Sequence, residues 1–117
     1  EAKKKYPILS EENLRSKFPN TYKNLNNLNK ILKKNNVNPI FITQTTATGF
    51  SAPVLFYQNQ ITKNFANENN YNIIKLDEEL VVNWDHFYDN IHVNEYGSEF
   101  IASYLEEKLL PYVETIN

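Results

Sequence analysis

The sequence predicts an α/β fold, in which helices alternate with strands of a parallel sheet. Two short runs rich in β-branched and aromatic residues, 37–43 and 71–76, predict buried strands. Helical patterns precede, separate and follow them, in the order helix, strand, helix, strand, helix. Strands in this order pair in parallel, with helices on both faces of the sheet.

The first helix is expected to start at a capping residue. Ser10 precedes Glu11 and Glu12, whose negative charges suit the first turn of a helix. The pattern predicts a short helix that continues to Phe18, and Pro19 interrupts it.

A longer helix and the first strand follow. Residues 20–35 are predicted to form an amphipathic helix, closed by Asn35 and Asn36. Its apolar side chains recur at three- and four-residue spacing: Tyr22, Leu25, Leu28 and Leu32. The strand over 37–43 leads into a polar loop at 44–50.

The second half repeats this alternation. A helix is predicted over residues 52–69, with Pro53 in its first turn. Its inward side chains are expected to be Leu55, Ile61, Phe65 and Ala66. The second strand, 71–76, is followed by an aromatic-rich connection over 77–88. The last helix is predicted to begin at Asn94, a capping residue, and to stop at Pro111.

Length and sheet size together predict an incomplete domain. The 117 residues are enough for one domain and too few for two. Two parallel strands make a poor sheet, because parallel sheets are buried and usually have more members. We therefore expect residues 1–117 to be a single C-terminal segment of a larger α/β domain. The N-terminal part would be a separate chain or a missing segment.

Composition excludes several functional classes. The net charge of −2, with Arg15 as the only arginine, provides no basic surface for nucleic acid. No apolar run is long enough to cross a bilayer. The absence of cysteine excludes disulfides, thiolate nucleophiles and cysteine-based zinc sites. With Gly49 and Gly97 as the only glycines, no phosphate-binding loop can be built.

The segment 88–97, Tyr-Asp-Asn-Ile-His-Val-Asn-Glu-Tyr-Gly, carries the clearest chemical signal. Asp89 lies three residues before His92, so it can accept a hydrogen bond from one imidazole nitrogen and select the tautomer. The other nitrogen can then take a proton from a nucleophile. Asn94 and Gly97 follow at the start of an amphipathic helix.

This pattern resembles the closing segment of the SGNH (GDSL-type) serine hydrolases. The shared sequence is Asp-x-x-His, then His-x-Asn-x-x-Gly-x-x-x-Ile-Ala, which covers Asp89 to Ala102. The runs 40–44 and 73–77 are similar to the last two core strands of that family. The resemblance implies a three-layer α/β/α fold of the flavodoxin-like kind, a serine nucleophile after the first strand, and no cofactor or metal.

Carried over to this chain, the resemblance makes His92 the general base and Asp89 the residue that orients it. The implied substrate is an ester, such as an acetylated carbohydrate or a lipid, and a secreted or cell-envelope location is suspected. The chain departs from the family in having no Gly-Asp-Ser and no Gly-x-Asn-Asp sequence. Four of its five serines, at 10, 51, 98 and 103, stand in contexts that do not match the nucleophile.

Other residues are candidates for substrate binding. Thr45, Thr46, Thr48 and Phe50 follow the carboxyl end of a strand, where α/β sheets bind ligands, or belong to a plain loop. A second group could line an acyl or sugar subsite, or fill the core: Trp84, Phe87 and Tyr88.

Two alternatives to the serine hydrolase remain. Asp85, His86, Asp89 and His92 could hold a metal ion, although their spacing does not match a helical His-x-x-x-His site and there is no third histidine. His86 lies among aromatic residues, a setting more typical of packing than of catalysis. A non-catalytic interaction module that has kept the fold would explain the missing serine motif.

Overall fold

The computed structural model describes residues 6–47, 53–80 and 82–114. In order, its elements are α1 (Glu11–Lys17), α2 (Pro19–Lys34), β1 (Ile40–Ile42), α3 (Pro53–Glu68), β2 (Asn72–Ile74), α4 (Leu76–Glu79), the 3₁₀ helix η1 (Trp84–His86) and α5 (Glu95–Glu114). The fold is therefore helix-rich α/β, and the predicted order of the long helices and strands is confirmed.

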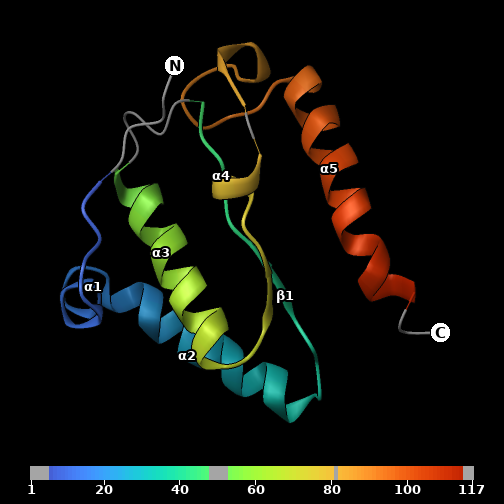
Figure 1. The fold of residues 1–117 in the computed structure, drawn as a ribbon. Helices are drawn as coiled ribbons and strands as arrows, with labels where there is room; N and C mark the ends of the chain where they lie inside the picture. Colours follow the sequence, from blue (N-terminus) through green and yellow to red (C-terminus); the bar gives the residue numbers. More distant parts are fainter. Residues whose placement is uncertain (1–5, 48–52, 81, 115–117) are drawn as a thin grey trace.

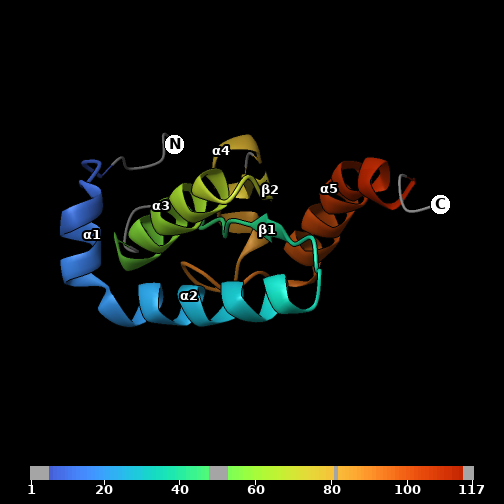
Figure 2. The ribbon, with the colours of Figure 1, turned by 90° about the horizontal axis from the view of Figure 1, so that it is seen from below.

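The two strands form a small parallel sheet, as predicted. Ile40 pairs with Asn72 and Ile42 pairs with Ile74. In Figure 1, α3 and α5 lie on opposite sides of the strands. In Figure 2, α2 runs along the side of β1 that faces away from β2. The side chain of Phe41 packs against Phe65 of α3, so successive residues of β1 contact different layers.

Both long helices that precede a strand end in the same way. Asn36 follows α2 with a φ of 52°, and Asn70 follows α3 with a φ of 56°. Asparagine tolerates this left-handed conformation better than most residues, and it reverses the chain after a helix. At the other end of the fold, the Ser10 hydroxyl oxygen accepts a hydrogen bond from the Asn13 amide at 3.1 Å. The predicted helix boundaries are confirmed here.

The core consists of two clusters. One lies between α1, α2 and α3 and is centred on Leu14, Tyr22 and Ile61. The other lies between the sheet, the segment after β2 and α5, and its buried members are Ala47, Ile74, Leu76, Leu80, Val82 and Phe87. The side chains of α5 that pack on this second cluster are only half-buried: Ile101, Tyr104, Leu105 and Leu109. The apolar face of α5 is thus only partly covered.

Three expectations about the elements were wrong. The strands are shorter than the apolar runs that predicted them, because only three residues of each run pair with the neighbouring strand. The connection after β2 contains α4 and η1, which were not predicted. Pro111 lies inside α5 rather than at its end. A proline there removes one helical hydrogen bond to the Glu107 carbonyl, and both residues lie on the exposed surface of the helix.

The start of α5 is fixed against η1. The Asn94 side-chain oxygen accepts a hydrogen bond from the Gly97 amide at 2.8 Å, and its side-chain nitrogen donates to the Asp85 carbonyl at 2.8 Å. The Asn94 amide donates to the His86 carbonyl at 3.0 Å. A Cβ atom on Gly97 would lie 2.0 Å from that same carbonyl oxygen, so only glycine fits. These contacts set the position from which α5 starts.

No helix in the described ranges combines the length and the apolar character needed to cross a membrane. The molecule measures 42 × 42 × 18 Å along its principal axes. Its radius of gyration is 15.4 Å, whereas a compact domain of this length is expected to have about 13 Å. The shape is that of a flat slab.

Replacing Gly97 by alanine should destabilise the fold strongly. The added methyl group would overlap the backbone carbonyl of His86, and overpacking of this kind costs about 1–3 kcal/mol or more. The measurement is urea unfolding followed by circular dichroism. Ser98→Ala, on the exposed surface of the same helical turn, is the control and should change stability little. Equal stability of the two variants would contradict the close contact.

Candidate active site

The Asp-x-x-His sequence forms a closed turn between Phe87 and Val93. These two residues make an antiparallel bridge, and the Tyr88 amide donates to the His92 carbonyl at 2.8 Å. The turn is tied to the carboxyl end of β1, because the Ala47 amide donates to the Asn90 carbonyl at 3.0 Å. Both ends of the turn and its tip are therefore held by backbone hydrogen bonds.

Within this turn, Asp89 and His92 contact each other as predicted. Oδ2 of Asp89 lies 2.7 Å from Nδ1 of His92. Oδ1 of Asp89 accepts hydrogen bonds from the Ile91 amide at 2.9 Å and from the His92 amide at 2.8 Å. One carboxylate oxygen thus fixes the backbone of the turn, and the other orients the imidazole.

These contacts keep Asp89 ionised. The hydrogen bond from the Ile91 amide, with those from the side chain and amide of His92, lowers the pKa of Asp89 to about 2. An ionised carboxylate only accepts hydrogen bonds, so Nδ1 of a neutral His92 carries the proton and Nε2 has a free lone pair. His92 then has the tautomer that a general base needs.

A groove lies beside the pair. Its volume is about 590 Å³, and the described residues that line it are Gln44, Pro53, Val54, Leu55, Gln58, Asp89, Asn90, Ile91 and His92. The side chains of His92 and Asp89 are 70% and 57% exposed, so Nε2 can be reached from outside. The groove runs between the first turns of α3 and the Asp-His turn, and it has the size of a small-molecule site.

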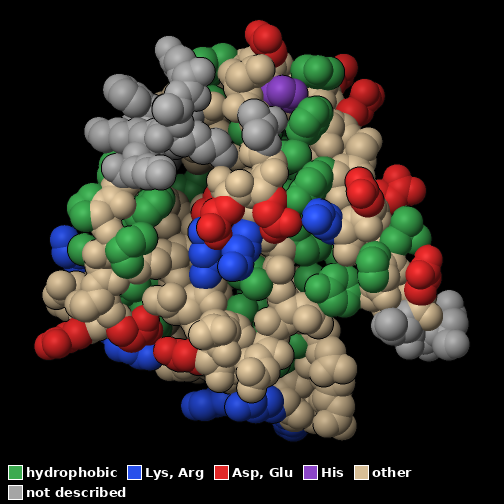
Figure 3. Space-filling model, in the orientation of Figure 1, with side chains coloured by type: hydrophobic (Ala, Val, Ile, Leu, Met, Phe, Trp, Pro, Cys, Tyr) green, Lys and Arg blue, Asp and Glu red, His purple; other side chains and the backbone are tan. Residues whose placement is uncertain are grey.

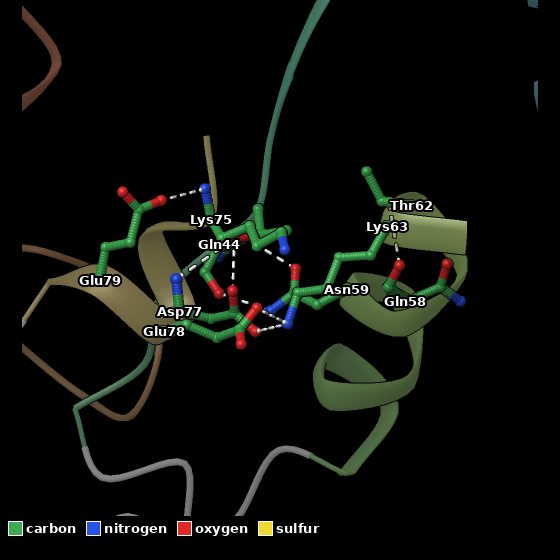
Figure 4. Close-up of polar contacts among 10 residues, drawn as sticks. Gln44, Gln58, Asn59, Thr62, Lys63, Lys75, Asp77, Glu78 and Glu79 are labelled. Carbon is green, nitrogen blue, oxygen red and sulfur yellow. Dashed lines mark hydrogen bonds and ion pairs between the residues drawn. The ribbon is translucent and has the colours of Figure 1, made fainter. Parts of the chain in front are cut away.

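Polar side chains anchor the wall of this groove to the sheet. The Asn59 side chain accepts from the Gln44 amide at 2.9 Å and donates to the Gln44 carbonyl at 2.7 Å. Asn59 itself is 7% exposed, and this pair of part-buried bonds holds the backbone just after β1. Figure 4 shows Asn59 and Lys63 reaching from α3 toward Gln44 and Asp77.

A cluster of charged side chains lies next to this contact between Asn59 and Gln44. The Thr43 hydroxyl lies 2.6 Å from Asp77, and the Lys63 ammonium lies 2.6 Å from Asp77 and 2.9 Å from Glu78. Burial lowers the pKa of Lys63, but hydrogen bonds and ion pairs with Asp77 and Glu78 outweigh it, and the net pKa is raised. In Figure 3, acidic and lysine side chains gather near the centre of the face that carries α4. We interpret the group as structural, because every charge in it has a partner.

Three of the predicted substrate-binding residues, Thr45, Thr46 and Trp84, are not among the described residues that line the groove. Thr45 and Thr46 are 4% and 9% exposed and pack inward at the end of β1. Trp84 lies on η1, is 48% exposed, and is not among the described residues that line the groove. Phe50 and Thr48 lie outside the described residues. The groove uses Gln44 and the first turns of α3 instead, because the loop turns the threonine side chains into the core.

The residues of the aromatic segment before the turn also differ in their burial. Phe87 is 6% exposed and belongs to the core, whereas Tyr88 is 75% exposed. His86 is 5% exposed and stacks on Tyr96 at a centroid distance of 4.8 Å. Its Nδ1 accepts from the Asn83 amide at 3.2 Å, so His86 packs and caps rather than lining the site.

Neither a metal-binding group nor a serine completes the site within the described part of the chain. No three histidine, aspartate or glutamate side chains lie close enough there to hold a metal ion. The serines that the structure describes, Ser10, Ser16, Ser98 and Ser103, do not line the groove. Ser51 lies outside the described residues. The geometry therefore provides an imidazole held by a carboxylate, with space beside them.

Replacing Asp89 by asparagine should shift the His92 tautomer. The neutral amide can offer its N–H to Nδ1, which favours a proton on Nε2 and removes the free lone pair there. Nitrogen-15 shifts of the neutral imidazole report this directly. Glu95→Gln, on the exposed first turn of α5, is the control and should leave the shifts unchanged. The same tautomer in both variants would contradict the orienting role of Asp89.

Lowering the pH should weaken the hydrogen bonds that Asp89 accepts, over a pH range set by its pKa. Because folding lowers the pKa of Asp89 to about 2 from an ordinary value of 3.8, its stabilising effect is complete above about pH 4. The effect is lost as the pH falls toward 2. The carboxyl carbon-13 shift of Asp89 should therefore titrate near pH 2, and a midpoint near 4 would contradict these hydrogen bonds.

Replacing Asn59 by alanine should loosen the groove wall. The Gln44 amide and carbonyl would lose their partners in a part-buried setting, and each such hydrogen bond stabilises the fold by about 0.5–1.5 kcal/mol. Amide hydrogen exchange at Gln44 should become faster, while exchange at Ile91 and His92 should stay slow. Thr62→Ala, one turn further along α3, is the control for a change in helix composition. Unchanged exchange at Gln44 would rule out the anchor.

Comparison with known proteins does not assign the chain to a family. No family model, no curated protein and no solved structure matches the chain. The assignment of a function therefore rests on the site and on the fold that positions it.

Proposed function

We propose that this chain supplies the aspartate and the histidine of a serine ester hydrolase of the SGNH type. The observation that carries the proposal is the 2.7 Å contact between Nδ1 of His92 and Oδ2 of Asp89, beside an accessible groove. In a triad of this kind, the carboxylate orients the imidazole and stabilises its charged form. The remaining member is a serine, which we place outside the described residues.

The reaction follows from the free lone pair on Nε2. The serine oxygen attacks the ester carbonyl carbon while Nε2 takes the hydroxyl proton. The tetrahedral intermediate collapses, the C–O bond to the alcohol breaks, and His92 returns the proton to the departing oxygen. Water then repeats these two steps on the acyl-enzyme and releases the acid. Asp89 stays ionised throughout and holds the imidazolium in place.

The fold supports the same proposal. A parallel pair of strands with α3 and α5 on opposite sides fits the end of a three-layer α/β/α domain. The Asp-His turn lies at the carboxyl end of β1, the edge at which α/β sheets bind ligands. Two further residues of the sequence pattern have structural roles. Asn94 caps α5, and Gly97 permits the contact of α5 with His86.

The groove is consistent with a small ester substrate. Its walls combine apolar side chains from Val54, Leu55 and Ile91 with the amides of Gln44 and Gln58. An apolar acyl or alkyl group would pack against the former, and the amides could hydrogen-bond a carbonyl or hydroxyl group. Acetylated carbohydrates and short-chain lipids both meet this description.

The competing proposal is an interaction module that keeps the fold and lacks chemistry. The absence of a serine from the groove, among the residues described, is the observation that favours it. A metal-dependent hydrolase is a further alternative. A chelator would stop a metal-dependent activity and would leave a serine hydrolase unaffected.

Replacing His92 by alanine in the complete protein should abolish ester hydrolysis. Loss of a general base lowers the rate by about 10²–10⁴-fold, and the assay is release of nitrophenol from a short-chain nitrophenyl ester. Glu106→Gln, on the exposed surface of α5, is the matched control and should hydrolyse normally. Circular dichroism should show both variants folded. Undiminished hydrolysis by His92→Ala would remove His92 from the mechanism, and no hydrolysis by the unsubstituted protein would favour the interaction module.

A further inference from the structure

The wall of the groove that α3 supplies contains one polar side chain among apolar ones. Val54, Leu55 and Gln58 line the groove together, because residues three and four apart lie on one face of a helix. Gln58 is the polar member of this wall, and it is half-buried. A polar side chain in such a wall decides which atoms of a ligand can lie against it.

Two hydroxyl groups hold Gln58 in place. The Thr21 hydroxyl of α2 donates to Oε1 of Gln58 at 3.0 Å. The Thr62 hydroxyl, one turn further along α3, donates to the backbone carbonyl of Gln58 at 2.9 Å (Figure 4). The first of these contacts joins the side-chain amide to a second helix, so the orientation of the amide is set by the packing of α2 against α3.

The contact with Thr21 leaves the amide nitrogen of Gln58 available to a ligand. Oε1 already accepts the hydroxyl hydrogen, whereas the amide nitrogen of a glutamine carries two N–H donors. Within the described ranges, no group accepts a hydrogen bond from Nε2 of Gln58. Nor is Nε2 one of the enclosed polar atoms without a partner in that part of the chain, so a molecule in the groove can reach it.

This donor is better ordered than the other glutamine of the groove. The hydrogen bonds of Gln44 to Asn59 come from its backbone, and Gln44 is exposed. A side chain that is already held loses less conformational entropy when it binds a ligand. A hydrogen bond from Gln58 therefore contributes more to binding than one from Gln44.

The position of His92 indicates which part of an ester would meet Gln58. In a serine hydrolase the histidine passes a proton to the departing oxygen, so the leaving alcohol lies beside the imidazole. His92 and Gln58 line the same groove. An alcohol that extends from the departing oxygen along this groove would lie against the wall that α3 supplies.

We infer that the groove is the subsite for the leaving alcohol, and that Gln58 selects esters whose alcohol carries a second oxygen atom. Nε2 of Gln58 donates a hydrogen bond to that ether, hydroxyl or carbonyl oxygen, and Val54 and Leu55 pack against the carbon chain. Thr21 is a positioning residue that keeps the amide in this orientation. The inference rests on the proposed function and names the part of the substrate that the groove takes.

The test compares the hydrolysis of two esters of the same shape by the complete protein. Methoxyethyl acetate has an ether oxygen where butyl acetate has a methylene group. Titration of the released acetic acid gives kcat/KM for each ester, and the ratio of the two values cancels any change that affects both.

The variants separate the donor from the rest of the side chain. Gln58→Met removes the N–H donors and keeps the side-chain length. Gln58→Glu also removes the donors but keeps an acceptor for the Thr21 hydroxyl. Asn67→Asp, exposed on the same helix and outside the groove, is the control for exchanging an amide for a carboxylate. Circular dichroism reports whether each variant is folded.

We expect kcat/KM for methoxyethyl acetate, relative to butyl acetate, to fall about threefold to tenfold in both Gln58 variants, which is the effect of one hydrogen bond. Asn67→Asp should keep the ratio of the unsubstituted protein. Thr21→Val should lower the ratio, and Thr21→Ser, which retains the hydroxyl, should restore it. An unchanged ratio in the Gln58 variants would overturn the inference and leave the hydrolase standing. An unchanged ratio in Thr21→Val would overturn the role of Thr21.

A binding measurement separates the two proposals. In the His92→Ala variant the esters stay intact, and the nitrogen-15 and proton signals of the Gln58 side-chain amide report contact with them. Methoxyethyl acetate should shift these signals more than butyl acetate does. Equal shifts would overturn the role of Gln58, even if the unsubstituted protein hydrolyses both esters. The expected shifts without any hydrolysis by the unsubstituted protein would contradict the proposed function and leave Gln58 as the donor of the groove.

Discussion

The contact between Gly97 and the carbonyl of His86 is the constraint on which the site depends. It allows the first turn of α5 to lie directly against η1, with no side chain between the two backbones. Beside this contact, the Asn94 side chain caps α5 and donates a hydrogen bond to the Asp85 carbonyl. Because both ends of the intervening segment are fixed, residues 87–93 close into a turn, and Asp89 meets His92 within it.

A second constraint holds the other side of the groove. The backbone after β1 is clamped by Asn59 of α3, and the end of β1 is joined to α4 through Thr43 and Asp77. Such buried polar contacts are expensive to leave unpaired, so they specify one position for the loop. The Ala47 to Asn90 hydrogen bond then connects this loop to the Asp-His turn. The groove is thus built between two rigid parts.

The site is positioned precisely although it lies at the surface. The side chains of His92 and Asp89 are more than half exposed, and the apolar face of α5 is only partly covered. Hydrogen bonds and charges of such a pair act more strongly when another group excludes water from it.

The sequence by itself determined the local features of this protein. Ser10, Asn36, Asn70 and Asn94 act on backbone groups a few residues away, so their caps and turns could be predicted from spacing alone. The same holds for the Asp89 to His92 contact, which spans three residues. Only the tertiary structure decided which side chains line the groove, because Thr45 and Thr46 turn inward and the first turns of α3 face His92. Those placements depend on contacts between segments far apart in the chain, such as Asn59 with Gln44, and no local pattern specifies them.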